Sequence, residues 1–217
     1  MNYAARRTER ASLGFLLAPM LVASIVSAVV PAFAAVSNVP AGGNFQTALD
    51  AAACGDTIVL QAGASYTTTY GFVLPAPKPP CAGTDADYVT VTTSGSVPLA
   101  GTRLDPPAYA TQMARLVASN IYPIIGTRTG AHHWKFVGIE FTSDGAFALS
   151  NLIEIGSSSV IGTGATLAER QQMKGFIFDR CFVHPSEINA TNLSSMSTIR
   201  HAERGFIVNA TDVPAAL

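Results

Sequence analysis

Acidic and basic side chains that can exchange protons gather in the last fifth of the chain. Asp179 and Arg180 are adjacent within an apolar, strand-like run, and His184 ends the same run. A second group, Arg200-His201-x-Glu203-Arg204, forms a charge-rich turn. These residue types perform general acid–base catalysis where folding brings them onto one surface. The alternative is a structural role. In that case Asp179 accepts hydrogen bonds from backbone amides in a turn, Arg180 projects into solvent, and the second group is a solvated loop.

Histidines and aromatic residues offer further candidates. His132 and His133 are neighbours. In an extended strand their side chains would point to opposite faces, so packing or surface roles are expected rather than joint binding of a metal ion. Four aromatic residues could stack on sugar rings: Trp134, Tyr66, Tyr70 and Tyr122. The alternative is that they are partly buried in the core or cap. No metal site is predicted. The acidic candidates Asp85, Asp87 and Asp144 do not have the spacing of a known calcium-binding loop.

The chain contains three cysteines, Cys54, Cys81 and Cys181. Cys54 and Cys81 are close in sequence and lie beside turn residues, so in an exported protein they are predicted to form a disulfide. Cys181 lies inside an apolar strand pattern and is expected to be a free thiol that packs as a small apolar side chain. The sequence has no zinc-binding spacing and no phosphate-binding, dinucleotide-binding, serine-hydrolase or metalloprotease motif.

The N-terminal segment has the features of a secretory signal peptide in the correct order. Arg6, Arg7 and Arg10 give a positive start, residues 11–30 are apolar and uncharged, and Ala32-Phe33-Ala34 supplies a signal peptidase site. The apolar run could also span a bilayer, but the cleavage site favours removal. The predicted organisation is a signal peptide over residues 1–34 and a secreted domain, extracellular or periplasmic, over residues 35–217.

Composition and charge limit the possible partners. Removal of the signal segment, with its three Arg and one Glu, leaves 10 basic and 13 acidic residues, a net charge of −3. No nucleic-acid or membrane partner is expected. A net charge of −3 also does not attract a polyanionic substrate. Charged residues make up only 12% of the chain, whereas Gly (18) and Pro (13) are plentiful. This balance predicts an all-β fold of short strands and many turns.

One short helix and several strands follow from the local pattern. Asn44 is a good N-cap, apolar residues follow at helical spacing over residues 45–53, and Gly55 is expected to end the helix. Strands are expected over residues 58–60, 71–74 and 88–93. Residues 108–118 fit either a helix or an irregular turn.

Two similar segments lie 42 residues apart. Residues 134–142 read WKFVGIEFT and residues 176–184 read FIFDRCFVH, so Phe136 aligns with Phe178 and Thr142 with His184. Each segment is followed by a second apolar run, residues 152–156 and residues 205–209. A recurring strand–turn–strand unit is typical of a stacked β-solenoid. A sandwich or jelly roll also has short strands at intervals.

Residues 41–63, AGGNFQTALDAAACGDTIVLQAG, resemble the N-terminal cap of pectate-lyase-like proteins of the pectin lyase fold. GAHHWKFVGIEF, at residues 130–141, looks like the first core coil of secreted bacterial members, and DRCFVH, at residues 179–184, like the next. The resemblance implies a right-handed parallel β-helix whose apolar end is covered by a short helix. It also implies that the protein acts on or binds extracellular polysaccharide, as a lyase or hydrolase if it is an enzyme. The alternative is a non-catalytic surface or adhesion module.

The resemblance bears on the site as well. β-helix lyases typically use a basic residue to abstract a proton beside a uronate carboxylate, often with calcium held by acidic residues, so calcium is implied by the resemblance alone. The catalytic candidates are Asp179, Arg180, His184 and Arg204, with Glu187, Arg200, His201 and Glu203 as further charged residues. A cluster of acidic and basic side chains on one sheet of consecutive coils would distinguish an enzyme from an adhesion module.

The end of the chain departs from the family pattern. A complete pectate-lyase-like β-helix has many more coils than the two recognised by sequence. The chain is therefore expected to be a piece of a larger protein, marginally stable alone and with an open strand edge prone to association. An inactive fragment is the third hypothesis.

Overall fold

The computed structural model describes residues 34–79, 81–102, 104–128, 130–145, 149–156, 174–186 and 202–208. All of them belong to one compact unit, Ala32–Leu217. The expected signal peptide lies outside the described residues apart from Ala34. The backbone is fixed directly after the expected cleavage site, because Ala35 donates its N–H to the carboxylate of Asp56 at 2.8 Å and accepts the N–H of Thr57 at 2.8 Å.

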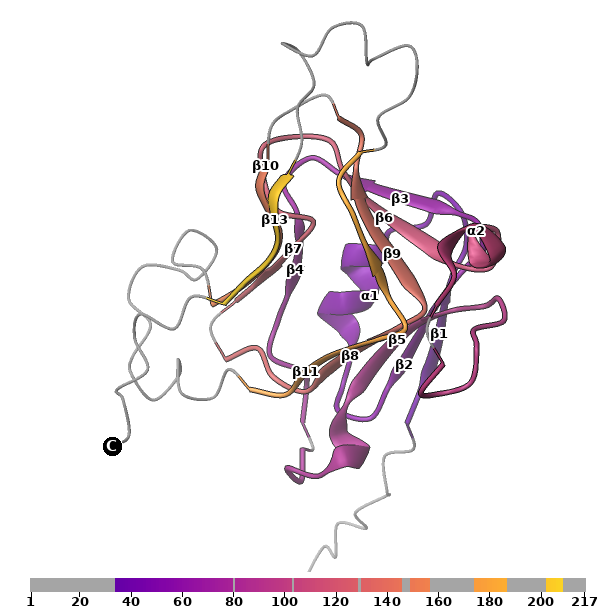
Figure 1. Ribbon diagram of the computed structural model, residues 1–217. Helices are drawn as coiled ribbons and strands as arrows, with labels where there is room; N and C mark the ends of the chain where they lie inside the picture. The colour runs from indigo at the N-terminus through magenta and orange to yellow at the C-terminus, as the bar shows by residue number, and fades with distance from the viewer. Residues whose placement is uncertain are drawn as a thin grey trace, which may run out of the picture. The chain divides into compact units, whose positions relative to one another are not determined.

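The strands of the described residues form three parallel sheets (Figure 1). The first sheet contains, in spatial order, β1 (Val36–Val39), β2 (Thr57–Leu60), β5 (Val89–Thr93), β8 (Trp134–Val137) and β11 (Phe176–Asp179). The second contains β3 (Ser65–Thr68), β6 (Ala114–Ala118), β9 (Ile139–Ser143) and β12 (Phe182–Val183). The third contains β4 (Phe72–Leu74), β7 (Ile125–Thr127), β10 (Leu149–Ile155) and β13 (Ala202–Val208).

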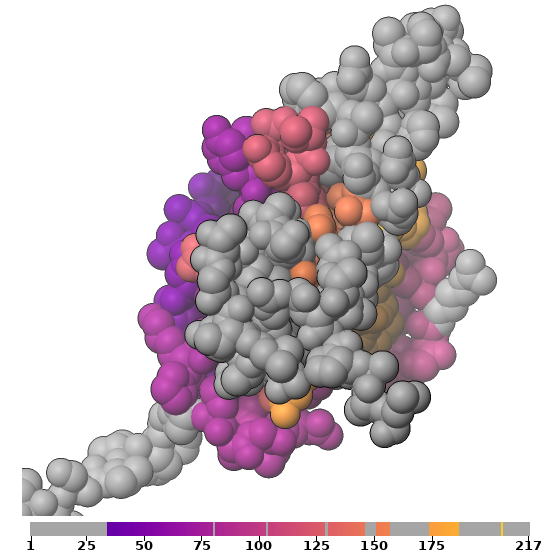
Figure 2. Space-filling model, turned by 90° about the vertical axis from the view of Figure 1, so that its left-hand side faces the viewer, coloured from indigo at the N-terminus to yellow at the C-terminus, as the bar shows by residue number. Residues whose placement is uncertain are grey.

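The chain visits these sheets in a fixed order. After β1, each triplet of strands places one strand in each sheet: β2-β3-β4, β5-β6-β7, β8-β9-β10 and β11-β12-β13. Figure 2 views the side of the third sheet, with the indigo and purple N-terminal residues to one side and orange residues of β10 towards the middle. The helical elements of the described residues are short: α1 (Phe45–Ala51), α2 (Pro106–Tyr109) and the 3-10 turn η1 (Asp85–Asp87). The prediction of an all-β protein is confirmed at the level of parallel sheets with few helices.

Strand pairing confirms the 42-residue alignment. Phe136 pairs with Phe178, and their rings stack with centroids 5.2 Å apart and planes 6° apart. The following apolar runs also pair, in β10 and β13. The interpretation of residues 130–141 as the first coil is wrong, because β8 is the fourth strand of its sheet. The earlier triplets cannot be recognised as a sequence repeat of constant length. The strands of the first sheet pair at spacings of 33 residues (β2 to β5) and 45 residues (β5 to β8).

Helix α1 covers the apolar interior at the N-terminal end. The side chain of Asn44 accepts the N–H of Thr47 at 3.0 Å, as expected of an N-cap. Phe45 and Leu49 are buried, and Figure 1 shows α1 between the three sheets. The helix ends at Ala51, so the expected capping role of Gly55 is wrong. Gly55 instead has a φ of +89° in the turn that leads into β2, a conformation that glycine adopts without strain.

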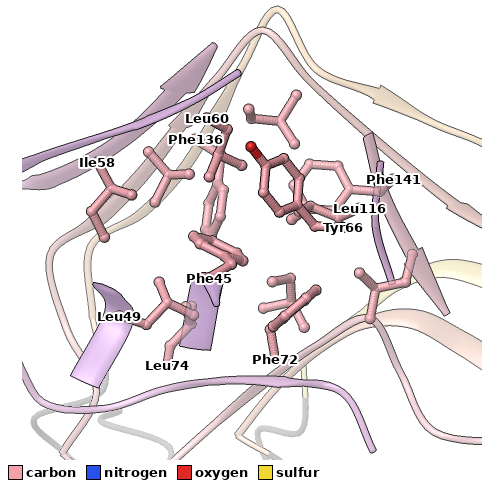
Figure 3. Close-up of a cluster of buried hydrophobic side chains, with 14 of the residues drawn as sticks. Phe45, Leu49, Ile58, Leu60, Tyr66, Phe72, Leu74, Leu116, Phe136 and Phe141 are labelled. Carbon is pink, nitrogen blue, oxygen red and sulfur yellow. The ribbon is translucent and has the colours of Figure 1, made fainter. Parts of the chain in front are cut away.

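The space between the sheets is filled by inward-facing side chains. Figure 3 shows part of this core, with side chains from α1 and from all three sheets pointing towards one another. Its labelled members are Phe45, Leu49, Ile58, Leu60, Tyr66, Phe72, Leu74, Leu116, Phe136 and Phe141. Burial of each large apolar side chain contributes roughly 1.5–3 kcal/mol. Because this interior is occupied, side chains that meet a ligand must come from the outer faces and turns.

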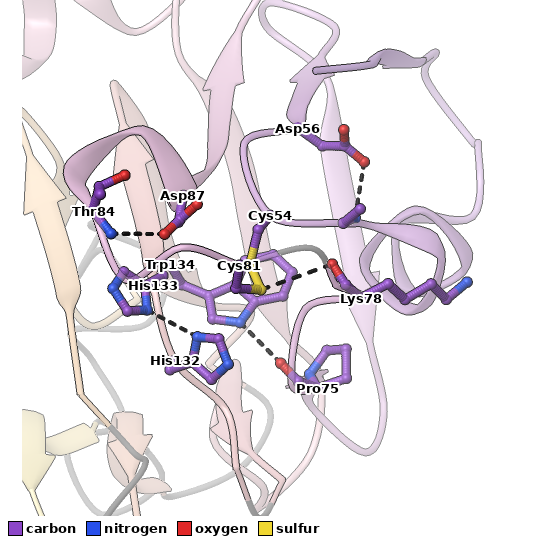
Figure 4. Close-up of a disulfide and its surroundings, with 11 residues drawn as sticks. Cys54, Asp56, Pro75, Lys78, Cys81, Thr84, Asp87, His132, His133 and Trp134 are labelled. Carbon is purple, nitrogen blue, oxygen red and sulfur yellow. Dashed lines mark hydrogen bonds between the residues drawn. A yellow bond between two sulfur atoms is a disulfide. The ribbon is translucent and has the colours of Figure 1, made fainter. Parts of the chain in front are cut away.

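A disulfide joins Cys54 to Cys81, with a Cα–Cα distance of 5.4 Å (Figure 4). It is the pairing expected from the sequence. The bond links the turn before β2 to the segment after β4, where Cys54 also donates its N–H to the carbonyl of Lys78 at 3.0 Å. Cys181 is free and packs against the core. Its burial raises the pKa of the thiol to about 12.

Candidate functional site

Three charged side chains meet on the outer face of the second sheet. Arg115 of β6 pairs in register with Glu140 of β9, and His184 directly follows β12, the next strand of this sheet. The adjacent residues Leu116 and Phe141 are buried in the core, so strand alternation turns Arg115 and Glu140 outward. Arg115 is not among the sequence candidates because residues 108–118 have no clear periodicity. The structure resolves that segment into α2 followed by β6.

Glu140 is the centre of this cluster. Its Oε1 accepts hydrogen bonds from Nε of Arg115 at 2.7 Å and from Nε2 of His184 at 3.0 Å. The side chain of Glu140 is only 5% exposed. Burial is the largest influence on its pKa and raises it, but the hydrogen bonds and charges of His184 and Arg115 together outweigh burial, so the pKa lies below its ordinary value. The carboxylate is therefore ionised at neutral pH.

His184 faces a hydrogen-bond acceptor on each side of its ring. Its Nε2 contacts Glu140, and its Nδ1 lies 2.7 Å from the carbonyl oxygen of Pro185. Both ring nitrogens of His184 are therefore in contact with oxygen atoms of the protein.

Arg115 leaves part of its guanidinium open to solvent. Its side chain is 44% exposed, and Nε is the atom that contacts Glu140. Within the described part of the chain its terminal nitrogens have no hydrogen-bond partner. The guanidinium therefore presents donors in the planar fork that matches carboxylates.

Asp179 and Arg180 form a two-contact ion pair at the corner between β11 and β12. Nε of Arg180 lies 3.1 Å from Oδ1 of Asp179, and Nη2 lies 2.6 Å from Oδ2. The hydrogen bonds from Arg180 hold the pKa of Asp179 below its ordinary value, against the opposing effect of burial. The expectation that Arg180 projects into solvent is wrong, because its side chain is 16% exposed and Nη1 donates to the carbonyl of Pro98. Each charge is satisfied by the other.

An open groove of about 850 Å³ lies beside this ion pair. Asp105 and Pro106, at the start of α2, form part of one wall, and the segment from Asp179 to Phe182 forms part of the other. The ring of Phe182 stacks on that of His184, with centroids 4.1 Å apart. The groove and the Glu140 cluster are therefore connected through Phe182.

For the other charged candidates the structure describes at most the backbone. Arg204 lies in β13, in the third sheet, where its backbone pairs with Asn151, so the expected turn or loop is wrong for residues 202–204. Glu203 lies in the same strand. The side chains of both residues lie outside the described parts of the chain, as do Glu187, Arg200 and His201 in full.

The four aromatic candidates divide into two groups. Trp134 and Tyr66 are buried, where Trp134 donates its indole N–H to Pro75 at 3.0 Å and Tyr66 donates its hydroxyl to Val39 at 2.6 Å. Neither can stack on a sugar. Tyr70 and Tyr122 are 75% and 44% exposed, and their ring centroids are 5.8 Å apart. They lie in the turns after β3 and β6, so neighbouring triplets place them at the same corner.

The expected opposite orientation of His132 and His133 is wrong. Strand β8 begins only at Trp134, and His133 has a φ of +52°, so the two Nδ1 atoms lie 2.8 Å apart. Among the described residues, no group of three or more His, Cys, Asp or Glu side chains is placed to hold a metal ion. The carboxylate of the candidate Asp87 accepts the N–H of Thr84 at 2.7 Å.

Comparisons with protein-family models, curated proteins and solved structures find no match to this chain. No helix in the described ranges is both long and apolar enough to cross a membrane.

Proposed function

We propose that the three sheets form one right-handed parallel β-helix of the pectate-lyase-like kind, and that the exported protein binds extracellular polysaccharide on the outer face of the second sheet. The fixed order in which the chain visits the sheets, the parallel pairing and the position of α1 over the apolar interior support the β-helix. The signal-peptide pattern and the disulfide support export to an oxidising compartment.

The observation that carries the binding proposal is the Arg115–Glu140–His184 cluster, which the ring of Phe182 connects to the open groove. Polysaccharides present hydroxyl groups, and acidic ones add carboxylates. The exposed guanidinium of Arg115 suits a carboxylate, and the buried, ionised Glu140 holds that guanidinium in place through Oε1. A groove of about 850 Å³ has the size of a small-ligand site.

The same geometry favours binding over catalysis. Both ring nitrogens of His184 already contact oxygen atoms of Glu140 and Pro185, and Arg180 neutralises Asp179. A general base needs an unoccupied lone pair within reach of the proton it abstracts. The side chains of this site therefore position a saccharide better than they would deprotonate it.

An exposed aromatic pair adds a second element to the proposal. Tyr70 and Tyr122 contact each other at one corner and present ring faces to solvent. Aromatic faces combine apolar area with a polar hydroxyl, which suits the C–H and O–H surface of a sugar. The pair lies in the turns at the C-terminal ends of β3 and β6, so a polysaccharide that crosses the second sheet could contact both features.

The test is a binding assay of the secreted form against polygalacturonate, alginate and an uncharged glucan, by affinity electrophoresis and calorimetry. The informative variant is Arg115→Gln, and the matched control is Arg128→Gln. Arg128 is also an exposed arginine in an ion pair, with Asp50 at 3.4 Å. We expect an acidic polymer to bind best, and Arg115→Gln to weaken this binding about tenfold by loss of one charge-assisted contact.

Two outcomes would overturn the proposal. If Arg115→Gln and Arg128→Gln bind equally well, the Arg115–Glu140–His184 cluster is not the binding site. If no polymer binds, polysaccharide is not the partner. Release of unsaturated uronate products, detected by ultraviolet absorbance, would show elimination chemistry and contradict a role in binding alone.

A further inference from the structure

His132 and His133 bring two ring nitrogens together at the start of β8. Their Nδ1 atoms are 2.8 Å apart, and their rings are nearly perpendicular, with 87° between the planes. Consecutive side chains in an extended strand diverge, so this approach requires the left-handed backbone conformation of His133, at φ +52°. Figure 4 shows the two rings facing each other near Trp134 and the disulfide.

The neighbouring triplets hold this arrangement in place. His133 donates its N–H to the carbonyl of Lys174 at 3.0 Å, and its own carbonyl accepts the N–H of Val89 at 2.8 Å. The ring of Tyr88 packs edge-on against that of His133, with centroids 5.1 Å apart. His133 is therefore fixed by backbone contacts on both sides.

The backbone of His133 adopts the left-handed conformation, at φ +52°. A positive φ is uncommon for residues with a Cβ atom, although histidine, asparagine and aspartate adopt it more often than the others. Residues in this conformation cluster at ligand sites, where the surrounding structure enforces it. At His133 the conformation brings two imidazole nitrogens together.

The separation of these nitrogens is that of a hydrogen bond, and it also matches one coordination geometry. If two imidazole nitrogens each lie about 2.0–2.1 Å from one ion, a separation of 2.8 Å subtends an angle of roughly 85–90° at the ion. That is the angle between adjacent positions in a square-planar or tetragonal site, whereas tetrahedral zinc would hold the nitrogens further apart. Square-planar and tetragonal nitrogen and oxygen sites are typical of Cu²⁺, which also binds such ligands most tightly among the divalent first-row ions.

We infer that His132 and His133 form a copper(II) site in which the Nδ1 atoms occupy two adjacent positions and solvent or a ligand completes the coordination. Without the ion, one ring donates its Nδ1 proton to the other. On binding, that ring moves its proton from Nδ1 to Nε2 by exchange with solvent, so both rings stay neutral and no net proton is released.

The experiment uses the secreted form without a histidine tag, titrated with CuCl₂ and followed by calorimetry and electron paramagnetic resonance. The variants are His132→Gln and His133→Asn, and asparagine is chosen because it tolerates positive φ. His201→Gln is the matched control, because it removes a histidine that belongs neither to this pair nor to the Glu140 cluster. Circular dichroism and the urea midpoint establish that each variant is folded.

We expect one copper per chain, a tetragonal spectrum with coupling to two imidazole nitrogens, and at least about tenfold weaker binding in each of the two variants. The control should bind copper as the wild type does. Unchanged copper affinity in both folded variants, or a spectrum with no imidazole coupling, would overturn the inference and leave a hydrogen-bonded pair with a structural role.

Discussion

Replacement of Glu140 by glutamine removes the carboxylate that accepts hydrogen bonds from Arg115 and His184 while leaving side-chain volume nearly unchanged. A hydrogen bond to a charged group contributes about 1.5–3 kcal/mol, and loss of one member of a buried ion pair costs about 3–5 kcal/mol. Water can solvate Arg115, which is 44% exposed, whereas His184 is only 14% exposed. We therefore expect Glu140→Gln to lower the free energy of unfolding by about 2–3 kcal/mol at pH 7.

The effect should depend on pH in a defined direction. The pKa of Glu140 in the folded protein is lowered. A lowered pKa means that the stabilisation is present above the unfolded-state pKa, about 4.3, and is lost as the pH falls through the folded-state pKa. The difference between wild type and variant should therefore be constant near neutrality and shrink below about pH 4.

Urea denaturation followed by tryptophan fluorescence measures both quantities, because Trp134 is the single tryptophan and is buried. Asp50→Asn is the matched control, since it removes an acid from the exposed ion pair with Arg128 and should cost under about 1 kcal/mol. Equal stability of Glu140→Gln and Asp50→Asn at pH 7, or a difference that grows in acid, would refute the reasoning.

Three further predictions concern the fold. Cys54→Ser opens the disulfide and should lower the free energy of unfolding by about 3 kcal/mol in urea denaturation, and an unchanged midpoint would contradict a structural role. Burial raises the pKa of Cys181 to about 12, so at pH 8 iodoacetamide should label it far more slowly in the folded than in the urea-unfolded protein, and equal rates by mass spectrometry would exclude this burial. Tyr66→Phe deprives Val39 and Gln61 of a buried hydroxyl partner and should cost about 1–2 kcal/mol in the same urea assay, whereas a cost near zero would show that water replaces it.

Parts of the fold that rest on local chemistry could be predicted from the sequence. The cap at Asn44, the apolar stripe of α1 and the 42-residue alignment that stacks Phe136 on Phe178 all depend on residue type and spacing alone. Strand β3 could not be found this way, because its sequence SYTT buries only Tyr66 and is otherwise polar. The early triplets were missed for a related reason, since their spacing varies with the length of the connecting turns.

The site was only partly predictable. His184 is a sequence candidate, but Glu140 is not, although the same alignment places Thr142 beside His184 and Glu140 two residues earlier on the same strand face. Arg115 carries no signal of this kind, because its position opposite Glu140 depends on pairing across 25 residues. The histidine pair could not be predicted from strand alternation, because the left-handed conformation of His133 depends on contacts from the neighbouring triplets.

Hydrogen–deuterium exchange of the secreted form, with and without its best-binding acidic polysaccharide, tests the central claim most directly. The proposed site predicts slower exchange in β6, β9 and the segment around His184, with the third sheet unaffected. Protection confined to the third sheet or to the disulfide region, with these segments unchanged, would contradict the assignment of the Arg115–Glu140–His184 cluster as the binding surface.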